Sequence, residues 1–448
     1  MKYVLAIIIL GILILVHEFG HFVLAKKNGI LVKEFSIGLG PRLFSVKKGE
    51  TRYSIKALPI GGSCIMYGGI DDPGEEEEDP DSEEAKERAK YLEGRSFNDK
   101  SVWARIAVLF AGPLFNFLLA FVLSMIVIGF VGYDPARIVA VDEKSSAYEA
   151  GLREGDIITK YNSNSIHFGR EMFLEEYINP IDSEDDVIYL EFVRNGEKHS
   201  ASFNAESYDK IALGISYQAD SNEAKLYGVV EDSPMDAAGA KEDDVITSIN
   251  GVEINSGADL HKYLEGFELN ENESISMTLK RGSDEIQIEV KPTLLTYYSS
   301  GFAFNTAREK TSPIKVLEYS FWELEYQIET VYKSLVMLFT GHISPTELSG
   351  PVGIVDVIGD TYDEAASQGA FVVVMSLANI TILLSANLGV MNLLPIPALD
   401  GGRLLFAFIE LIRRKPISKE REGIVHFVGM VFLMALMVFI VVNDIKRW

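Results

Sequence analysis

Four long apolar segments constrain the fold of this chain more than any other feature of its sequence. They cover residues 4–25, 102–131, 371–394 and 423–442. A helix needs roughly 20 apolar residues to cross a hydrocarbon core of ~30 Å, and only helices and closed barrels satisfy their backbone hydrogen bonds there. The sequence therefore predicts an α-helical polytopic membrane protein with four transmembrane helices. With their flanks, the four regions are placed at residues 1–31, 101–134, 370–402 and 423–443.

The first apolar segment also fits a signal peptide, because Lys2 precedes an apolar run. A leader has no need of ionisable residues in that run, and this one contains His17, Glu18 and His21. We expect the segment to be retained as a transmembrane helix.

Basic residues predict the orientation of the helices, since short cytoplasmic loops are enriched in Lys and Arg. The first segment is followed by Lys26, Lys27 and Lys33. The loop between the last two segments carries a larger basic set: Arg403, Arg413, Arg414, Lys415, Lys419 and Arg421. Both loops are therefore expected in the cytoplasm, with the two termini and the long middle segment outside.

Charge and cysteine content exclude two classes of protein. The formal net charge of −24 is opposite in sign to that of a surface that binds nucleic acid. The single cysteine, Cys64, rules out a disulfide framework. The extracytoplasmic domains must then fold on hydrophobic cores alone.

Between the first two apolar segments the chain changes character twice. Residues 32–58 alternate like short strands around a Lys48-Gly49-Glu50 turn, and Gly61-Gly62 then breaks the pattern. We expect residues 32–70 to form a small membrane-associated β-sheet or hairpin. Residues 71–100 begin with a run of Asp and Glu, which favours a solvated acidic linker over a cation or partner site.

The middle segment contains an internal repeat. Residues 150–159 (AGLREGDIIT) recur as residues 238–247 (AGAKEDDVIT), and each copy is followed by a strand-rich stretch. The repeat resembles a tandem pair of PDZ domains, β-rich modules placed at residues 135–206 and 207–295. Such a domain binds a peptide that adds a strand to its sheet edge; the alternative is that the copies only fill space.

Residues 313–341 place apolar side chains at alternating steps of three and four, which predicts an amphipathic helix. The charged residues off this stripe make it unsuitable as a membrane span. We expect the helix to lie in the membrane interface or to pack beside the core helices, and a role as a substrate gate stays open.

The first apolar segment carries the motif His-Glu-Phe-Gly-His at residues 17–21. Residues four apart share a helix face, so His17 and His21 can bind one ion. Zinc accepts nitrogen ligands, and a catalytic zinc site has three protein ligands and an open position for water. Glu18 lies one step away, where its carboxylate can act as a general base. Ionisable groups inside an apolar span are costly unless paired or metal-bound; the alternative is that the three side chains satisfy hydrogen bonds between helices.

A third ligand is expected near the end of the third span. Pro395 and Pro397 interrupt its helix, and broken backbone at membrane depth is tolerated where it lines a cavity or is buried in protein. Asp400 follows, and would complete a ligand set of two histidines and one aspartate. The alternative is that Asp400 caps the turn before Gly401-Gly402.

These motifs resemble those of the site-2 protease family of intramembrane zinc metalloproteases, in particular its bacterial RseP/RasP type with tandem PDZ domains. Members carry His-Glu-x-x-His in the first core helix and Leu-Asp-Gly in the third, matched here by residues 17–21 and 399–401. The similarity covers nearly the whole chain. It extends, in the same order, to residues 35–41, 61–62, 111–116, the PDZ-like copies and residues 350–353.

The resemblance implies a zinc metalloendopeptidase with one catalytic zinc ion, bound by His17, His21 and Asp400 with Glu18 as the catalytic residue. The implied substrates are single-span membrane proteins, such as anti-sigma factors already cut by an upstream site-1-type protease, and remnant signal peptides. The implied location is the bacterial cytoplasmic (inner) membrane, as a multi-pass protein with the PDZ domains on the extracytoplasmic side. The lipid bilayer is then its surroundings, and nucleic acid is not a partner.

The resemblance also implies contacts between Asn387 and Asn392 and the substrate backbone, since the family has asparagine at the matching positions. Amide side chains can pair with backbone groups that are freed when a helical substrate unwinds. The alternative is that these asparagines bond neighbouring helices. Asn116 is a further candidate for substrate binding.

The sequence departs from the family pattern at two places. Ser63-Cys64 stands where the family often has an aromatic residue and valine. The second PDZ-like copy has Ala240 and Asp243 where the first has Leu152 and Gly155, which bears on the shape of its groove.

Two other classes of function compete with an endopeptidase. A catalytically silent PDZ scaffold or membrane chaperone would have lost the glutamate or a ligand, and all four residues are present. A metal transporter would distribute polar residues across the span, whereas here they cluster at one depth. The sequence therefore favours regulated intramembrane proteolysis.

Overall fold

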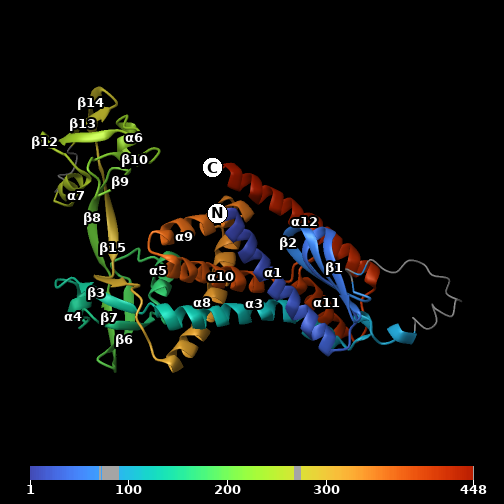
Figure 1. The fold of residues 1–448 in the computed structure, drawn as a ribbon. Coiled ribbons are helices and arrows are strands. Elements are labelled where there is room, and N and C mark those ends of the chain that lie inside the picture. The colour runs from blue at the N-terminus through green and yellow to red at the C-terminus, as the bar shows by residue number, and fades with distance from the viewer. Residues whose placement is uncertain (70–71, 73–89, 267–273, 447–448) are drawn as a thin grey trace. The chain divides into compact units, whose positions relative to one another are not determined.

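The computed structural model describes residues 1–69, 72, 90–266 and 274–446 (Figure 1). The chain forms two compact units, one of Met1–Tyr133 with Arg308–Trp448 and the other of Asp134–Ala307. Most of the acidic linker expected at residues 71–100 lies outside the described residues.

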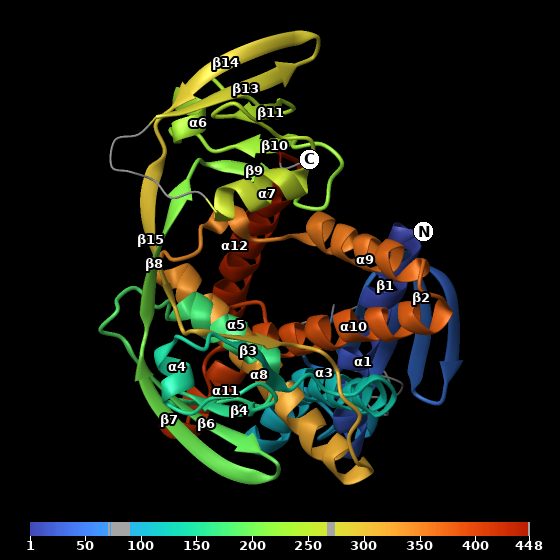
Figure 2. The ribbon, with the colours of Figure 1, turned by 90° about the vertical axis from the view of Figure 1, so that its left-hand side faces the viewer.

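Four helices of the first unit are long and apolar enough to cross a membrane, among the residues described. They are α1 (Lys2–Lys27), α3 (Val102–Val131), α10 (Ala370–Leu393) and α12 (Lys419–Lys446). Helices α1 and α10 pack against α3 (Figure 2). The approach of α1 to α3 depends on Gly20, because a Cβ atom there would lie 2.3 Å from the carbonyl oxygen of Ala111. The predicted polytopic membrane fold is confirmed.

Three further long helices lie in the described part of this unit: α8 (Pro313–Thr340), α9 (Pro351–Ala366) and α11 (Asp400–Arg413). The sequence predicted α8 but not the other two, whose first turns contain helix-disfavouring glycines. Only one of the residues that α8 buries, Val331, belongs to its apolar stripe. Its buried residues are Ser320, Glu323, Gln327 and Val331, whereas Ile314 and Phe321 of the stripe are exposed. An exposed apolar stripe is expected where the surrounding solvent is lipid.

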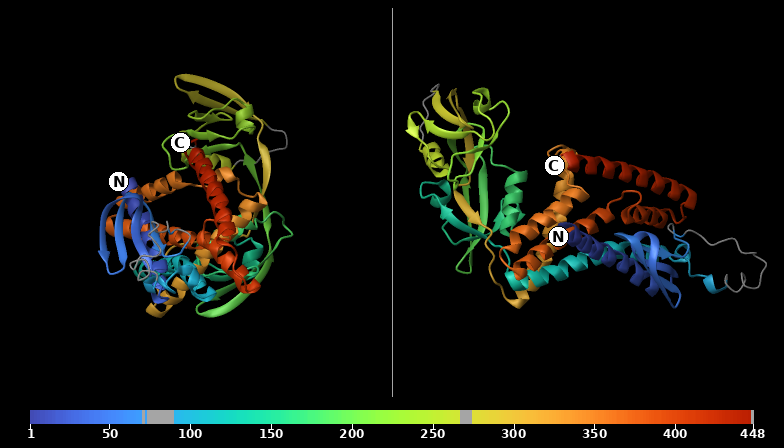
Figure 3. Two further views of the ribbon diagram at one scale, coloured as in Figure 1. Left: turned by 90° about the vertical axis from the view of Figure 1, so that its right-hand side faces the viewer. Right: turned by 45° about the horizontal axis from the view of Figure 1, so that its top comes forward.

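The predicted hairpin is present and is folded on itself. Its strands are β1 (Val32–Lys48) and β2 (Thr51–Met66), and they pack against α1 (Figure 3). Residues 32–37 of β1 pair on one side with residues 62–66 and on the other with residues 51–55 of β2. The second half of β1 then pairs with the outer side of the same stretch of β2.

A buried carboxylate ties three segments of this hairpin together. Glu34 is 4% exposed and accepts hydrogen bonds from Arg42 Nε at 2.8 Å, Arg42 Nη2 at 3.0 Å and Ser54 Oγ at 2.6 Å. Arg42 belongs to the outer half of β1 and Ser54 to β2. The bonds from Arg42, with those from Ser54, outweigh the effect of burial and lower the pKa of Glu34 to about 2.

The second unit consists of two β-rich, PDZ-like domains, each with its own hydrophobic core. The first has the strand order β16-β3-β4-β6-β7, with β5 paired to β4. Its elements are β3 (Ala136–Val141), α4 (Ser146–Glu149), β4 (Ile157–Tyr161), β5 (Asn164–Ser165), α5 (Gly169–Ile178), β6 (Val187–Arg194), β7 (Glu197–Asn204) and β16 (Phe302–Asn305).

The second domain has the strand order β12-β11-β13-β14 and a separate pair, β10-β9. Its elements are β9 (Ile215–Tyr217), β10 (Leu226–Val229), α6 (Pro234–Ala237), β11 (Val245–Ile249), β12 (Val252–Glu253), α7 (Gly257–Glu265), β13 (Ile275–Arg281) and β14 (Asp284–Val290).

The first domain is discontinuous in the sequence, because β16 pairs with β3 across the whole second domain. The chain leaves the first domain along β8 (Glu206–Ala212) and returns along β15 (Thr293–Ser299), and these two strands pair with each other. The two stretches expected at residues 135–206 and 207–295 therefore omit a strand of the first domain. The omission arises because pairing between distant strands leaves no mark in the local pattern.

The repeated motif forms the same ion pair in both domains. Asp156 accepts from Arg194 Nε and Nη2 at 2.7 Å each, and Asp244 accepts from the same atoms of Arg281 at 2.7 and 2.8 Å. Both aspartates are buried. The departure at Asp243 keeps the backbone shape: its φ is +71°, as Gly155 has +92° at the matching position, and aspartate tolerates this region better than most residues.

We predict that Asp244→Asn destabilises the second domain by about 1–3 kcal/mol, because Arg281 loses its buried partner. The hydrogen bonds from Arg281 lower the pKa of Asp244. The ion pair therefore contributes fully to the stability of the domain at neutral pH. This contribution is lost as pH falls below about 3.9, the ordinary pKa of aspartate, toward the lower pKa of the folded state. Hydrogen exchange of β11 and β13 in the full chain should become faster.

The matched control is Asp243→Asn, whose side chain is 76% exposed and pairs with Lys225 alone among the ion pairs described. It should change exchange little, since exposed pairs contribute about 0–1 kcal/mol. Equal exchange in the Asp244→Asn variant and the natural chain would contradict the role of this ion pair.

Candidate metal centre

Helix α1 places the two histidines of the motif on one face. His17 and His21 are 8% and 6% exposed, and their Nε2 atoms lie 3.2 Å apart. Both rings point away from the exposed side of α1, toward α3 and α11.

Asp400 joins them from the far end of the sequence. It is the first residue of α11, after the proline-containing loop of residues 394–399. Its Oδ2 lies 3.0 Å from His17 Nε2 and 3.2 Å from His21 Nε2. The predicted set of His17, His21 and Asp400 is thus brought together, with its ligand atoms within 4.8 Å of one another.

The geometry of the three donors fits a zinc ion. Tetrahedral zinc with bonds of about 2.0–2.2 Å separates its ligand atoms by about 3.3 Å. The three separations here are 3.0, 3.2 and 3.2 Å. The fourth tetrahedral position is left for water or substrate.

The second nitrogen of each histidine is oriented by a neighbour on α3. His21 Nδ1 lies 2.8 Å from the Val108 carbonyl oxygen, so Nδ1 carries the proton and Nε2 is the free donor for a metal. His17 Nδ1 lies 3.1 Å from the Asn116 amide.

The Asn116 amide supports the same tautomer for His17. As placed, its Oδ1 is buried without a hydrogen-bond partner, while its Nδ2 faces the ring. Amide oxygen and nitrogen are interchangeable in such assignments. If the amide is turned by 180°, its Oδ1 accepts a hydrogen bond from His17 Nδ1. The Nε2 atom of His17 is then left to bind a metal. Asn116, the further candidate for substrate binding, has no exposed surface and contacts His17.

A glycine on α3 leaves the space that the ligand atoms occupy. A Cβ atom at Gly112 would lie 2.4 Å from His21 Nε2 and 2.7 Å from His17 Nε2. Any larger residue would therefore clash with both imidazoles in this arrangement. Gly112 lies within the motif of residues 111–116, and nothing in its local sequence indicates that it faces the two histidines.

Glu18 lies beside the ligands and is half-buried. Its carboxylate is close enough to His21 for a Coulombic interaction. Strand β2 passes next to it, since a Cβ atom at Gly62 would lie 3.0 Å from Glu18 Cγ. The hairpin therefore borders the side of the centre on which the predicted base stands.

The two predicted substrate-binding asparagines lie on α10, and both are half-buried. The Asn392 amide donates to the Leu388 carbonyl one turn earlier, at 2.9 Å. Asn387 lies one and a half turns before Asn392 on the same helix.

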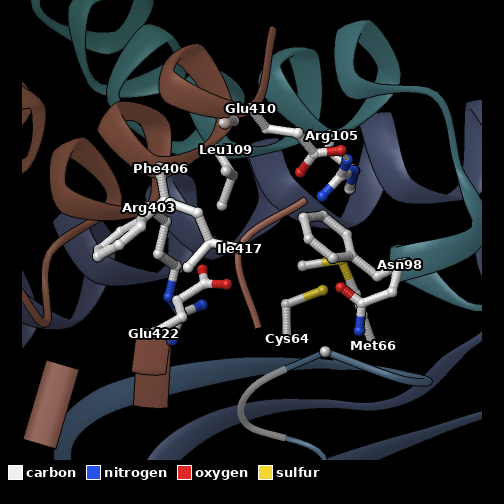
Figure 4. Close-up of a pocket in the computed structure, with 13 residues that line it drawn as sticks. Cys64, Met66, Asn98, Arg105, Leu109, Arg403, Phe406, Glu410, Ile417 and Glu422 are labelled. Carbon is white, nitrogen blue, oxygen red and sulfur yellow. Dashed lines mark hydrogen bonds and ion pairs between the residues drawn. The ribbon is translucent and has the colours of Figure 1, made fainter. Parts of the chain in front are cut away.

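A pocket with both polar and apolar lining lies between α3, α11 and the end of β2 (Figure 4). Arg105 and Glu410 form an ion pair within it, and Arg403 and Glu422 also line it. Arg403 lies one helical turn after Asp400. The pocket therefore contains four charged side chains.

One histidine beside the loop of Asp400 is not among the predicted site residues. His426 on α12 is 6% exposed, and its Nδ1 accepts a hydrogen bond from the Ala398 backbone at 2.8 Å. The sequence signal for it was a histidine at the start of an apolar span.

Comparisons with known proteins identify the family of this chain. The chain matches peptidase family M50 over residues 5–436. It is 32% identical over 454 residues to the "Regulator of sigma-W protease RasP" of Bacillus subtilis (strain 168), covering 98% of this chain and 97% of that protein. It is 31% identical over 467 residues to the "Zinc metalloprotease RasP" of Shouchella clausii (strain KSM-K16), covering 98% of each.

Part of the chain also aligns with the crystal structure of the HtrA3 PDZ domain bound to a phage-derived ligand. The identity is 19% over 20% of this chain and 93% of that chain, with a TM-score of 0.18. The assignment rests instead on the match along the whole length of the chain. The chain belongs to peptidase family M50, the membrane zinc metalloproteases of the site-2 type.

Proposed function

We propose that this protein is an intramembrane endopeptidase that hydrolyses single-span membrane proteins, using one zinc ion bound by His17, His21 and Asp400. The observation that carries the proposal is the convergence of three donor atoms among membrane-spanning helices. Glu18 stands on the same turn of α1 as the two histidines. One set of three donors with an open position supports a single catalytic ion.

The chemistry divides between the ion and the chain. A zinc ion held there supplies Lewis acidity toward the scissile carbonyl and toward water. Glu18 accepts a proton from the attacking water and returns it to the nitrogen of the leaving peptide. A C–O bond forms, the C–N bond breaks, and the products are a carboxylate and an amine. Val108 and Asn116 contact Nδ1 of the two imidazoles and so turn each Nε2 toward the place where the metal would lie.

A helical substrate must unwind before its backbone can be attacked. We assign Asn387 and Asn392 to the freed backbone groups, since amides can both donate and accept hydrogen bonds. Their half-buried positions on α10 leave part of each residue accessible. The Asn392 amide exchanges an internal bond to Leu388 for a substrate bond without loss of a partner.

The proposed substrates include anti-sigma factors and remnant signal peptides. The support is the full-length similarity to a protein named "Regulator of sigma-W protease RasP". An upstream site-1-type protease would act first on such a substrate. The PDZ-like unit would then admit the shortened form by size or capture its new terminus.

The proposed location is the bacterial cytoplasmic membrane, with the PDZ-like unit on the extracytoplasmic side. Lys26 and Lys27 lie in the last turn of α1, and Arg413 lies in the last turn of α11. Clustered basic residues at these two helix ends favour a cytoplasmic position for both.

Glu18→Gln is predicted to abolish most of the activity while zinc stays bound. The substitution keeps the shape of the side chain and removes the base, which contributes about 10²–10⁴-fold to the rate. Cleavage of a single-span test substrate and the zinc content of the purified protein would be measured together. Glu325→Gln, on the exposed side of α8, is the control and should cleave normally. A Glu18→Gln protein as fast as the control would rule out this base.

Asp400→Ala is predicted to weaken zinc binding sharply, because two histidines remain as the only protein ligands of the set. The loss should exceed the ~10–100-fold that removal of an outer-shell partner typically causes. Elemental analysis should find one zinc in the natural chain and much less in the variant. Asp363→Ala on α9, an exposed aspartate, should retain the metal. Full zinc content in Asp400→Ala would place the third ligand elsewhere.

Deletion of residues 134–307 is predicted to spare the metal centre and to remove selection among substrates. Tyr133 and Glu309 exchange backbone hydrogen bonds of 3.0 and 2.7 Å, so the two cut ends are adjacent and a short linker can join them. The variant should bind one zinc and cleave untrimmed substrates that the natural chain rejects. If a zinc-loaded deletion variant cleaves no substrate at all, the PDZ-like unit does not act as a size filter. Capture of the substrate then remains as its role.

A further inference from the structure

The loop that delivers Asp400 is held from two sides. Between α10 and α11 the chain runs through residues 394–399, where Pro395 and Pro397 prevent helical hydrogen bonding. On the α11 side, a Cβ atom at Gly402 would lie 2.4 Å from the Ile396 carbonyl oxygen. On the α12 side, a Cβ atom at Gly429 would lie 2.4 Å from Pro397 Cβ.

The backbone of this loop is strained at Ala398. Its φ is +79°, in the region where a Cβ atom approaches the carbonyl oxygen. Of the seven non-glycine residues with positive φ in the described chain, five are Asn or Asp, which adopt it more readily. A left-handed conformation is therefore unfavourable for an alanine. Such strain persists where the surroundings hold it.

His426 provides that hold. The Ala398 amide donates to His426 Nδ1 at 2.8 Å, which requires the ring proton to be on Nε2. Nε2 lies 3.9 Å from the Glu422 carboxylate one turn earlier on α12. The ring also packs against Phe406 of α11, with centroids 5.5 Å apart. Phe406 and Glu422 both line the pocket between α3, α11 and the end of β2 (Figure 4).

We propose that His426 is a positioning residue for Asp400: by accepting the Ala398 amide, it fixes the strained loop that presents the carboxylate to His17 and His21. Asp400 is two residues beyond Ala398, so a change in that peptide moves the start of α11. Helix α12 contributes no ligand to the set, and through His426 it still determines the geometry of the ligands. This inference rests on Asp400 being a zinc ligand, as proposed above.

The test compares two isosteric substitutions in the full chain. His426→Asn keeps an acceptor oxygen near the Nδ1 position and should bind Zn²⁺ nearly as tightly as the natural protein. His426→Gln places its amide near the Nε2 position, so Ala398 loses its acceptor. Its dissociation constant for Zn²⁺ should rise about tenfold, at the lower end for partners outside the first ligand shell. Competition of the metal-free protein with a chelating dye measures both.

Two further variants separate positioning from general packing. Ala398→Gly removes the Cβ that makes a positive φ costly, and added to His426→Gln it should restore part of the lost Zn²⁺ affinity. Phe427→Leu, on an exposed neighbour, should change nothing. With zinc loaded, His426→Gln should lower kcat and leave KM for a single-span substrate unchanged.

Equal Zn²⁺ affinity of the Asn and Gln variants, or no recovery on adding Ala398→Gly, would overturn the role of His426. That failure is distinct from failure of the zinc site itself. If Asp400→Ala also keeps its zinc, the ligand assignment is wrong; if it loses zinc while both His426 variants keep theirs, this inference alone falls.

Discussion

The fold of the membrane unit depends on placing three ionisable side chains where water is scarce. His17 and His21 are almost completely buried in a span of apolar residues, where an unpaired polar group would cost several kcal/mol. Each ring nitrogen has a partner. The Nδ1 atoms contact Val108 and Asn116 on α3, and the Nε2 atoms contact Asp400. The same arrangement suits metal binding, because the two Nε2 atoms and the Asp400 carboxylate face one point.

Small residues allow the helices to come close enough for this convergence. Gly20 brings α1 onto α3, Gly112 leaves room for the ligand atoms, and Gly402 and Gly429 let the loop of Asp400 lie between α11 and α12. In lipid, close packing and hydrogen bonds take the place of the hydrophobic effect between helices. Lipid surroundings also explain why α8 buries mostly polar residues and exposes apolar ones such as Ile314 and Phe321.

The PDZ-like unit is stabilised in the way of water-soluble proteins. Each of its domains has an apolar core and a buried aspartate paired with an arginine at the end of the neighbouring strand. The second domain is inserted into the first through the ribbon of β8 and β15. The chain leaves and re-enters the membrane unit at two paired residues, Tyr133 and Glu309. The insertion therefore begins and ends at adjacent points of that unit.

The sequence by itself determined the membrane class, the hairpin, the repeat and the candidates His17, Glu18, His21 and Asp400. Those features are written locally, as runs of apolar residues, as alternation, and as motifs whose spacing fixes a shared helix face. Only the tertiary structure decided the partners of each candidate. The return of β16 to β3, the buried position of Asn116, the space at Gly112 and the hydrogen bond from Ala398 to His426 all join residues far apart in the chain. Their contacts depend on how helices and strands pack, and no local pattern of residues records that.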